Sequence, residues 1–110
     1  MLIYKIFRTD EWAELRAAGQ TNGAPIDVAD GYVHFSTAET VKETAALHFK
    51  HEEDLLLLAV QADGLDMLKW EPSRNGVLFP HLYRELRLSD IVWHAPLPLI
   101  GGAHQFPDLT

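Results

Sequence analysis

Residues 69–83 read KWEPSRNGVLFPHLY, and this stretch decides how the chain is expected to fold. Two strand-like runs, Leu68 to Glu71 and Val77 to Tyr83, flank a turn that ends in Asn75-Gly76, a dipeptide favoured in hairpins. The pattern therefore predicts an antiparallel hairpin. Pro80 has no N–H for a neighbouring strand, so we expect the second strand to lie at a sheet edge or at a bulge.

The register of this hairpin determines where Glu71 points. A two-residue Asn75-Gly76 loop pairs Glu71 with Pro80, whereas a three-residue loop that starts at Arg74 pairs it with Phe79. Only the second register places the carboxylate on the face that carries the histidine and tyrosine of the second strand. The sequence leaves both registers open.

Outward from the hairpin, apolar runs indicate three more strands. Leu2 to Phe7 and Ile91 to His94 have β-prone compositions, and Leu55 to Val60 is apolar enough to be buried on both faces. A fourth short strand is expected at Tyr32 to Phe35, where alternation places Tyr32 and His34 on one face.

Two helices and one loop complete the predicted order. Asp10 to Ala18 has apolar residues at threefold spacing and is followed by Gly19, a typical helix end. Ser36 with Glu39 three residues later reads as a capping box, which predicts a second helix that starts at Ser36 and ends near Phe49. Between them, Gln20 to Asp30 is interrupted by Gly and Pro, so we expect a loop of about ten residues, a length typical of segments over binding sites.

Composition restricts the class of protein. The 110 residues include no Cys, so disulfides and thiolate metal sites are excluded. Their formal net charge of -7 disfavours non-specific binding of nucleic acid, which needs an excess of Lys and Arg. The longest apolar run is too short to span a bilayer, and no export signal is evident. We expect one domain over residues 1–110, of α+β class with two small, largely antiparallel sheets and two main helices, located in the cytoplasm.

Two segments combine a histidine with aromatic or hydroxyl side chains. In residues 31–36 (GYVHFS), His34 ends a strand just before a predicted helix start, where backbone N–H groups attract anions. In residues 79–83 (FPHLY), His81 lies beside two aromatic residues, an arrangement that suits a flat or hydroxyl-bearing ligand. Each segment also fits a structural role, with a half-buried histidine bonded to a carbonyl and the aromatic rings in the core.

Other candidate motifs are weaker. His48 and His51 are spaced so as to offer two metal ligands, but a cation near a helix C-terminus is favoured by the dipole, so we predict no metal site. The chain has no Gly-rich phosphate loop, His-Glu-x-x-His or Gly-x-Ser-x-Gly, which leaves the commonest nucleotide-hydrolysing, zinc-peptidase and esterase mechanisms without support.

Over nearly its whole length, the chain resembles a small, mainly bacterial family known as domain of unknown function 952 (DUF952). The resemblance rests on three segments in order: GYVHFSTAE at residues 31–39, KWEP at 69–72 and FPHLY at 79–83. The family is in turn similar to the ADP-ribosyltransferase superfamily, whose members cleave or transfer the ribosyl group of NAD in a cleft between two small sheets. The resemblance thus implies an ADP-ribosyltransferase-like fold and NAD as substrate.

The same resemblance implies a set of site residues. The implied catalytic residues are His34, Glu71 and His81, with His34 on a ribose hydroxyl. The implied ligand-binding residues are Tyr32, Ser36, Tyr83 and Lys5, with one tyrosine stacked on the ligand. An oxocarbenium-like transition state would need a carboxylate, for which Glu71 is the best candidate. The pyrophosphate would bind at the helix start after Ser36, with a cation from Lys5, Arg74 or Arg84.

Two positions depart from the family pattern. Lys5 stands where an early His is usual, and Thr40 stands where Gln commonly follows Glu39. Lys can bind a phosphate as a point charge, but it transfers protons near neutral pH only when its pKa is strongly lowered. The early position therefore has a different chemistry in this chain.

Three alternatives to a ribosyl-transfer enzyme remain open. A binding module for a nucleotide-like or sugar-like metabolite would use the pocket of His34, His81 and Tyr83 without turnover. An interaction domain would bury these residues without a shared cavity, and a metal-dependent hydrolase would need both histidines on one ion. The expected partner is a small nucleotide-like molecule rather than a membrane or nucleic acid, and the oligomeric state is left open.

Overall fold

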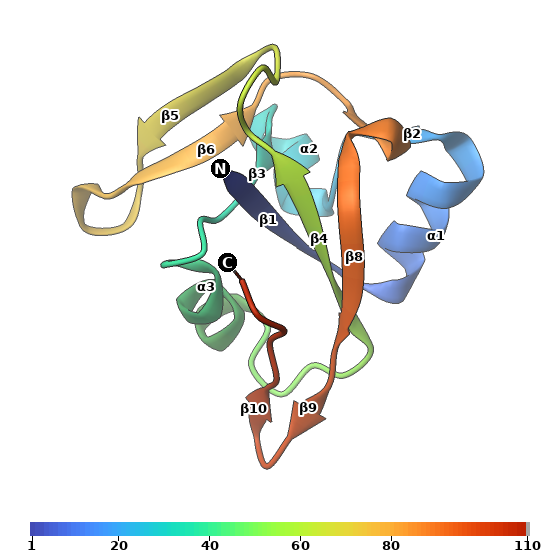
Figure 1. Cartoon of the computed structure of the whole chain (residues 1–110), viewed down its shortest axis with the longest axis vertical. Helices are drawn as coiled ribbons and strands as arrows, with labels where there is room; N and C mark the ends of the chain where they lie inside the picture. Colours follow the sequence, from blue (N-terminus) through green and yellow to red (C-terminus); the bar gives the residue numbers. More distant parts are fainter. Residues whose placement is uncertain (110) are drawn as a thin grey trace.

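The computed structural model describes residues 1–109, in which two three-stranded sheets, two short ribbons and three α-helices form an α+β fold (Figure 1). Every strand pair within this range is antiparallel. The predicted fold class is confirmed at this level, with one helix more than expected. None of the described helices is long and apolar enough to cross a bilayer.

The first sheet contains the most apolar strand at its centre. Its order is β1 (Leu2–Phe7), β4 (Leu55–Gln61) and β8 (Ile91–Leu97). β4 carries the LLLLAV run, and its residues Leu57 to Val60 are almost completely buried, as expected for a strand covered on both faces. The three predicted strands are confirmed, and β8 continues three residues past His94.

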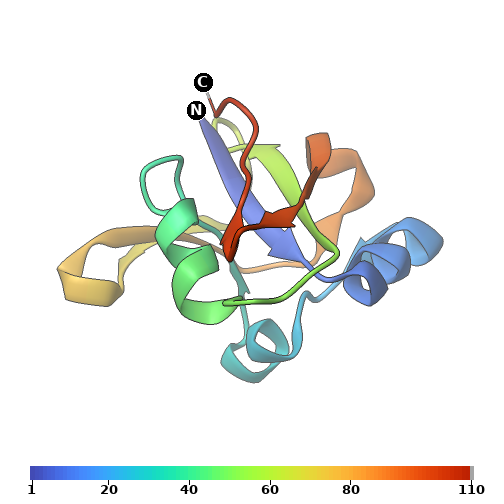
Figure 2. The ribbon, with the colours of Figure 1, turned by 90° about the horizontal axis from the view of Figure 1, so that it is seen from below.

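The second sheet contains the hairpin. Its order is β3 (Val33–His34), β6 (Leu78–Leu82) and β5 (Leu68–Pro72), so the hairpin strand β6 lies at the centre. Glu71 pairs with Phe79, which is the register of the three-residue loop. The loop Arg74–Gly76 is a single 3-10 turn in which Asn75 has a φ of 53° and Gly76 a φ of 76°, left-handed values that Asn and Gly tolerate. The hairpin projects from the body of the molecule in both views (Figures 1 and 2).

The position of Pro80 differs from the prediction of an edge strand or a bulge. It lies in β6, the central strand of the second sheet. Its carbonyl accepts a hydrogen bond from the N–H of Phe35, the residue just after β3 ends. The N–H and C=O of a strand residue point to the same side, so the N–H that proline lacks would also face this end of β3. The pyrrolidine ring of Pro80 therefore lies where the hydrogen bonds between β6 and β3 come to an end.

The helices differ from the prediction at two places. α1 (Thr9–Ala18) ends at Gly19, whose φ of 78° is left-handed, as expected. The segment expected to be a loop contains a six-residue helix, α2 (Pro25–Asp30), with proline at its first turn. α3 (Val41–His48) starts five residues later than predicted, because Ser36 pairs through its backbone with Tyr4 on β1 instead of capping a helix.

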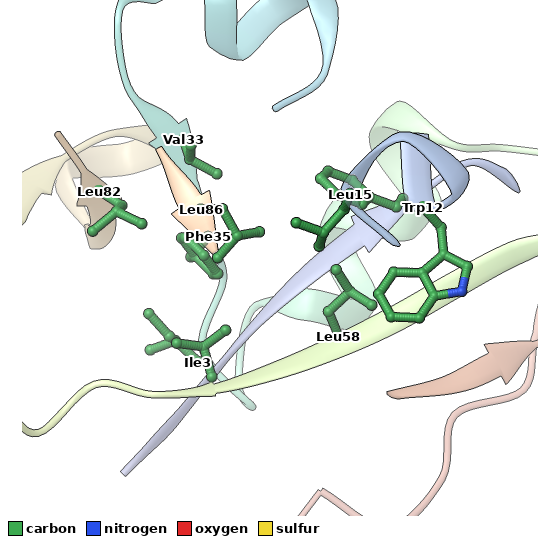
Figure 3. Packing of buried hydrophobic residues seen from close by; sticks show 10 residues of the cluster. Ile3, Trp12, Leu15, Val33, Phe35, Leu58, Leu82 and Leu86 are labelled. Carbon is green, nitrogen blue, oxygen red and sulfur yellow. The ribbon is translucent and has the colours of Figure 1, made fainter. Parts of the chain in front are cut away.

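Two buried clusters lie around the first sheet. The larger one joins α1, β1, β4 and the second sheet. Figure 3 shows Trp12, Leu15 and Leu58 packed on one side of it and Val33 and Phe35 on the other. The smaller one is built on Tyr4, Leu57 and Val41, between β1, β4 and α3. The remaining elements are the ribbons β2 (Gln20–Thr21) with β7 (Leu86–Arg87) and β9 (Leu99–Ile100) with β10 (Ala103–His104), and a 3-10 turn at Leu88–Asp90.

Candidate functional site

A cleft of about 930 Å³ opens beside β1, between the second sheet and the ends of the helices. Its volume falls within the range of small-molecule sites, roughly 300 to 1,000 Å³. Four of the seven residues named from the sequence line it: Lys5, His34, Ser36 and His81. The other three, Tyr32, Glu71 and Tyr83, lie outside the lining and contact His81 or one another.

His81 is the most constrained of these side chains. It is 6% exposed, and its Nδ1 lies 2.8 Å from Oε1 of Glu71. Among the described residues, its Nε2 has no hydrogen-bond partner. A carboxylate at Nδ1 fixes the tautomer that leaves the lone pair on Nε2, the nitrogen that remains for a ligand in the cleft. The three-residue loop brings this contact about, because it sets Glu71 opposite Phe79.

Glu71 also holds Tyr83. The Tyr83 hydroxyl donates a hydrogen bond of 2.6 Å to the same Oε1, and this bond, with burial, raises the pKa of Tyr83 to about 12. The hydrogen bonds from Tyr83 and then from His81 lower the pKa of Glu71. Glu71 is therefore an anion that bonds to His81 and Tyr83, and it does not line the cleft itself.

Tyr32 covers the other side of His81. The two rings stack with centroids 4.2 Å apart and an interplanar angle of 11°. Tyr32 also contacts the rings of His34 and Tyr83 edge to face, at 4.5 and 5.0 Å. Tyr32 thus packs against both histidines, and Tyr83 packs against Tyr32 and bonds to Glu71. The ligand-stacking role that the resemblance implies for one of these tyrosines is not the contact that the structure shows.

His34 pairs with His81 across β3 and β6, with ring centroids 5.4 Å apart. Its Nδ1 lies 2.6 Å from Oδ1 of Asp27, and its backbone N–H donates to the same oxygen at 3.0 Å. Its Nε2 lies 3.0 Å from Oδ2 of Asp30, which is 44% exposed. Both ring nitrogens therefore face carboxylates from α2, one of them buried and the other open to solvent.

Asp27 organises this side of the cleft. Its buried carboxylate accepts from Nζ of Lys5, with 2.8 Å to Oδ2, and from the backbone N–H of Ala24 at 2.7 Å. Burial raises the pKa of Asp27, but the hydrogen bond from His34 and the charge of Lys5 outweigh burial and hold the pKa below its usual range. Burial lowers the pKa of Lys5, and the charge of Asp27 and its hydrogen bond with Lys5 offset only part of this lowering.

Asp27 is the site residue that the sequence reasoning missed. It lies in the segment that was expected to be a loop, and its main partner is on β1, far away along the chain. A local signal was present, because Pro25 and Gly31 bracket a short helix. Gly23 leaves room for the carboxylate, since a Cβ at this position would lie 2.3 Å from Oδ2 of Asp27.

The expected pyrophosphate cradle does not form among the described side chains. The Ser36 hydroxyl lies 2.9 Å from the Thr44 hydroxyl, and no helix begins at Ser36. Lys5 is committed to Asp27, while Arg84 is paired with Asp66 and Asp90. The side chain of Arg74 lies outside the described part of the chain. Across the described residues, no three His, Asp or Glu side chains converge as metal ligands.

Fold and cleft together define an α+β protein with a small-molecule-sized cleft and two carboxylate-held histidines in its wall. The profile of the family described as "Protein of unknown function (DUF952)" matches residues 6–94, and the chain belongs to this family. No curated protein matches it.

Solved structures of one relative share the whole fold. The crystal structure of protein CC0527 from Caulobacter crescentus is 46% identical, with a TM-score of 0.92, over 96% of this chain and 94% of that one. A crystal structure of a double mutant of CC0527 gives 45% identity and the same TM-score and coverage. The solution NMR structure of CC0527 gives 45% identity and a TM-score of 0.84, over 94% of this chain and 90% of that one.

Proposed function

We propose that the cleft binds an N-ribosyl compound and that His81 accepts a proton during cleavage of its glycosidic bond. The observation that carries the proposal is the environment of His81. The side chain is buried, Glu71 holds its Nδ1, and its Nε2 has no hydrogen-bond partner among the described residues. A histidine that is oriented by a carboxylate and faces a cleft is the arrangement of a general base. NAD is the substrate that the resemblance to ADP-ribosyltransferases suggests, and the reaction is transfer or hydrolysis of its ribosyl group.

The chemistry needs only one base. When a nicotinamide N-glycosidic bond breaks, its electron pair returns to the ring, which leaves as a neutral molecule without protonation. The acceptor, water or another hydroxyl, forms a bond to the anomeric carbon and loses its proton to Nε2 of His81. Glu71 then stabilises the imidazolium, so its role is to position and polarise His81.

His34 supports the ribose in this proposal. Its Nε2 faces Asp30, whose carboxylate is 44% exposed and can turn toward solvent when a ribose hydroxyl takes its place. The hydroxyl can accept from His34 Nε2 or donate to it, as the protonation of the ring requires. Asp27 and Lys5 are positioning residues, because they hold His34 and do not need to contact the substrate.

A second candidate function is binding without turnover, and one observation favours it. Glu71 lies outside the lining of the cleft, so it is not in a position to contact a developing oxocarbenium ion. A site that binds a ribosyl compound with His34 and His81 but lacks this carboxylate contact would act as a metabolite-binding module. The two functions share the ligand and differ in whether the glycosidic bond is cleaved.

The test combines binding and turnover. A thermal shift of the purified protein with NAD, ADP-ribose, nicotinamide riboside and nicotinamide detects binding, since a ligand of the native state raises its stability by mass action. Release of nicotinamide from NAD or nicotinamide riboside detects turnover. We expect His34→Ala to lose the shift, and His81→Asn to lose turnover with the shift retained.

The matched control is His51→Asn, an exposed histidine outside the cleft lining whose left-handed φ of 64° asparagine tolerates. It should leave binding and turnover unchanged. A shift that is abolished by His34→Ala, with no nicotinamide released by the wild-type protein, would favour the binding module. No shift with any of these compounds at millimolar concentration would reject both functions.

A further inference from the structure

Three basic side chains in the lining of the cleft, Lys5, Arg8 and His34, are each paired with carboxylates. Lys5 lies 2.8 Å from Asp27, and His34 faces two carboxylates. Arg8 donates through Nε and Nη2 to the two carboxylate oxygens of Glu52, at 2.8 and 3.0 Å, and contacts Glu11 through Nη1 at 3.4 Å. A diphosphate that entered this region would have to compete with these carboxylates for the side chains of Lys5, Arg8 and His34.

Carboxylates also contribute directly to the lining. Asp10 and Glu11, in the first turn of α1, both line the cleft. Asp10 is exposed and has no hydrogen-bond or ion-pair partner among the described residues. The whole protein carries a formal net charge of -7, which adds to the repulsion of a polyanion. The electrostatics of the cleft thus favour a neutral or cationic ligand.

Two large aliphatic side chains in the lining are exposed to solvent, and we call the part of the cleft that they form its mouth. Ile26 on α2 and Leu47 on α3 line it and are 62% and 56% exposed, although each is a large aliphatic side chain. Exposed apolar side chains from two different helices around one cleft mark a site for an apolar or aromatic group. The polar part of the same cleft contains His34 and His81, so the two parts can hold two ends of one ligand.

We propose that the N-ribosyl ligand is a nucleoside without a phosphate, with its base between Ile26 and Leu47 and its ribose at His34 and His81. This inference rests on the proposed function, and it narrows the substrate from NAD to nucleosides. Nicotinamide leaves a riboside without a proton, whereas for a base such as adenine, which leaves as an anion, His81 passes the proton that it took from the acceptor on to the leaving base. A base provides the flat apolar surface that the mouth needs, and a ribose provides hydroxyls for the two histidines. A 5′-phosphate would add charge next to Asp10 and Glu11.

Calorimetric titration of the full chain tests the charge preference, with two matched pairs: adenosine against AMP, and nicotinamide riboside against its 5′-phosphate. We expect each nucleoside to bind at least about tenfold more tightly than its phosphate, with little dependence on salt. Equal or tighter binding of the phosphates, or of NAD, would overturn the inference and leave the proposed function standing. Binding of none of these compounds would reject the proposed function.

Variants of the mouth test the placement of the base. Ile26→Ser combined with Leu47→Ser should weaken adenosine binding by about tenfold, because both side chains lose their contact with the base. Val28→Ser is the matched control, since Val28 lies on the same helix and is 61% exposed but does not line the cleft. Equal affinities of the double variant and this control would contradict the placement.

Discussion

The two histidines that pair across β3 and β6 are each held at Nδ1 by a carboxylate, but their surroundings differ. On the His34 side, Asp27 is fully buried and bonded to a buried lysine and to backbone N–H groups. On the His81 side, Glu71 is 37% exposed, and its other partner is a tyrosine. The comparison indicates that Asp27 contributes mainly to the stability of the fold, whereas Glu71, partly exposed to solvent, is the carboxylate that orients His81 in the proposed function.

The largest expected effect comes from a variant that disrupts the ion pair of Asp27 with Lys5 on the His34 side. Asp27→Asn leaves the ammonium group of Lys5 buried without a counter-charge, which costs roughly 3 to 5 kcal/mol of the free energy of unfolding. Urea denaturation followed by circular dichroism measures this loss. Adding Lys5→Met removes the buried charge, so the double variant should recover part of the stability. No difference between the single and double variants would show that the ion pair is not the source of the loss.

A second variant reaches the same carboxylate through the backbone. Gly23→Ala places a Cβ 2.3 Å from Oδ2 of Asp27 at a φ of 99°, so it adds a clash to the backbone strain. Gly64→Ala, at a φ of 79° with open space around it, carries the strain alone, about 1 to 2 kcal/mol. We expect Gly23→Ala to be the less stable variant by at least about 1 kcal/mol in the same urea titration. Equal stabilities would mean that Asp27 moves away freely.

The pH dependence of stability tests the lowered pKa of Asp27 on the His34 side. The pKa of Asp27 is lower in the folded chain than in the unfolded chain, so its contribution is present above about pH 4 and is lost as the pH falls through the folded pKa. Thermal melts between pH 6 and pH 2.5 should show a steeper loss in the wild type than in Asp27→Asn. Parallel curves would contradict the lowered pKa.

The smallest effect sharpens the His81 side. The hydrogen bond to the Glu71 carboxylate, with burial and the charge of Glu71, raises the pKa of Tyr83 to about 12. Glu71→Gln removes the charge and weakens this hydrogen bond, so the phenol should titrate closer to its ordinary value of about 10. Ultraviolet absorbance of tyrosinate as a function of pH measures the change. Tyr83→Phe identifies the signal among the three tyrosines of the chain. An unchanged titration curve would show that Glu71 does not raise the pKa of Tyr83.

Local patterns predicted most of the strands. The apolar run of β4, the alternation around His34 and the Asn-Gly turn depend on neighbouring residues, and each is found where it was expected. The face shared by Tyr32 and His34 is confirmed by their ring contact. The hairpin register was left open because turn chemistry allows both loops, and it decides whether Glu71 meets His81.

The missed features depend on partners far along the chain. α2 has only six residues, fewer than two helical turns, so no apolar period marks it. The importance of Asp27 comes from Lys5 on β1, and the false capping box at Ser36 comes from its backbone pairing with Tyr4. A local sequence pattern cannot predict such contacts, because they form only when segments far apart in the sequence pack together.

The His81 cluster has a further consequence for how the protein folds. Glu71 is ten residues from His81 and twelve from Tyr83, all within one hairpin. Closing so short a loop costs little chain entropy, so this cluster can form within microseconds, on the timescale of a hairpin. His34 joins it only when strands from opposite halves of the chain pair. The contacts around His81 thus differ in range: those of Glu71 with His81 and Tyr83 lie within the hairpin and need only local chain closure, whereas the pairing of His34 with His81 in the wall of the cleft needs a long-range contact.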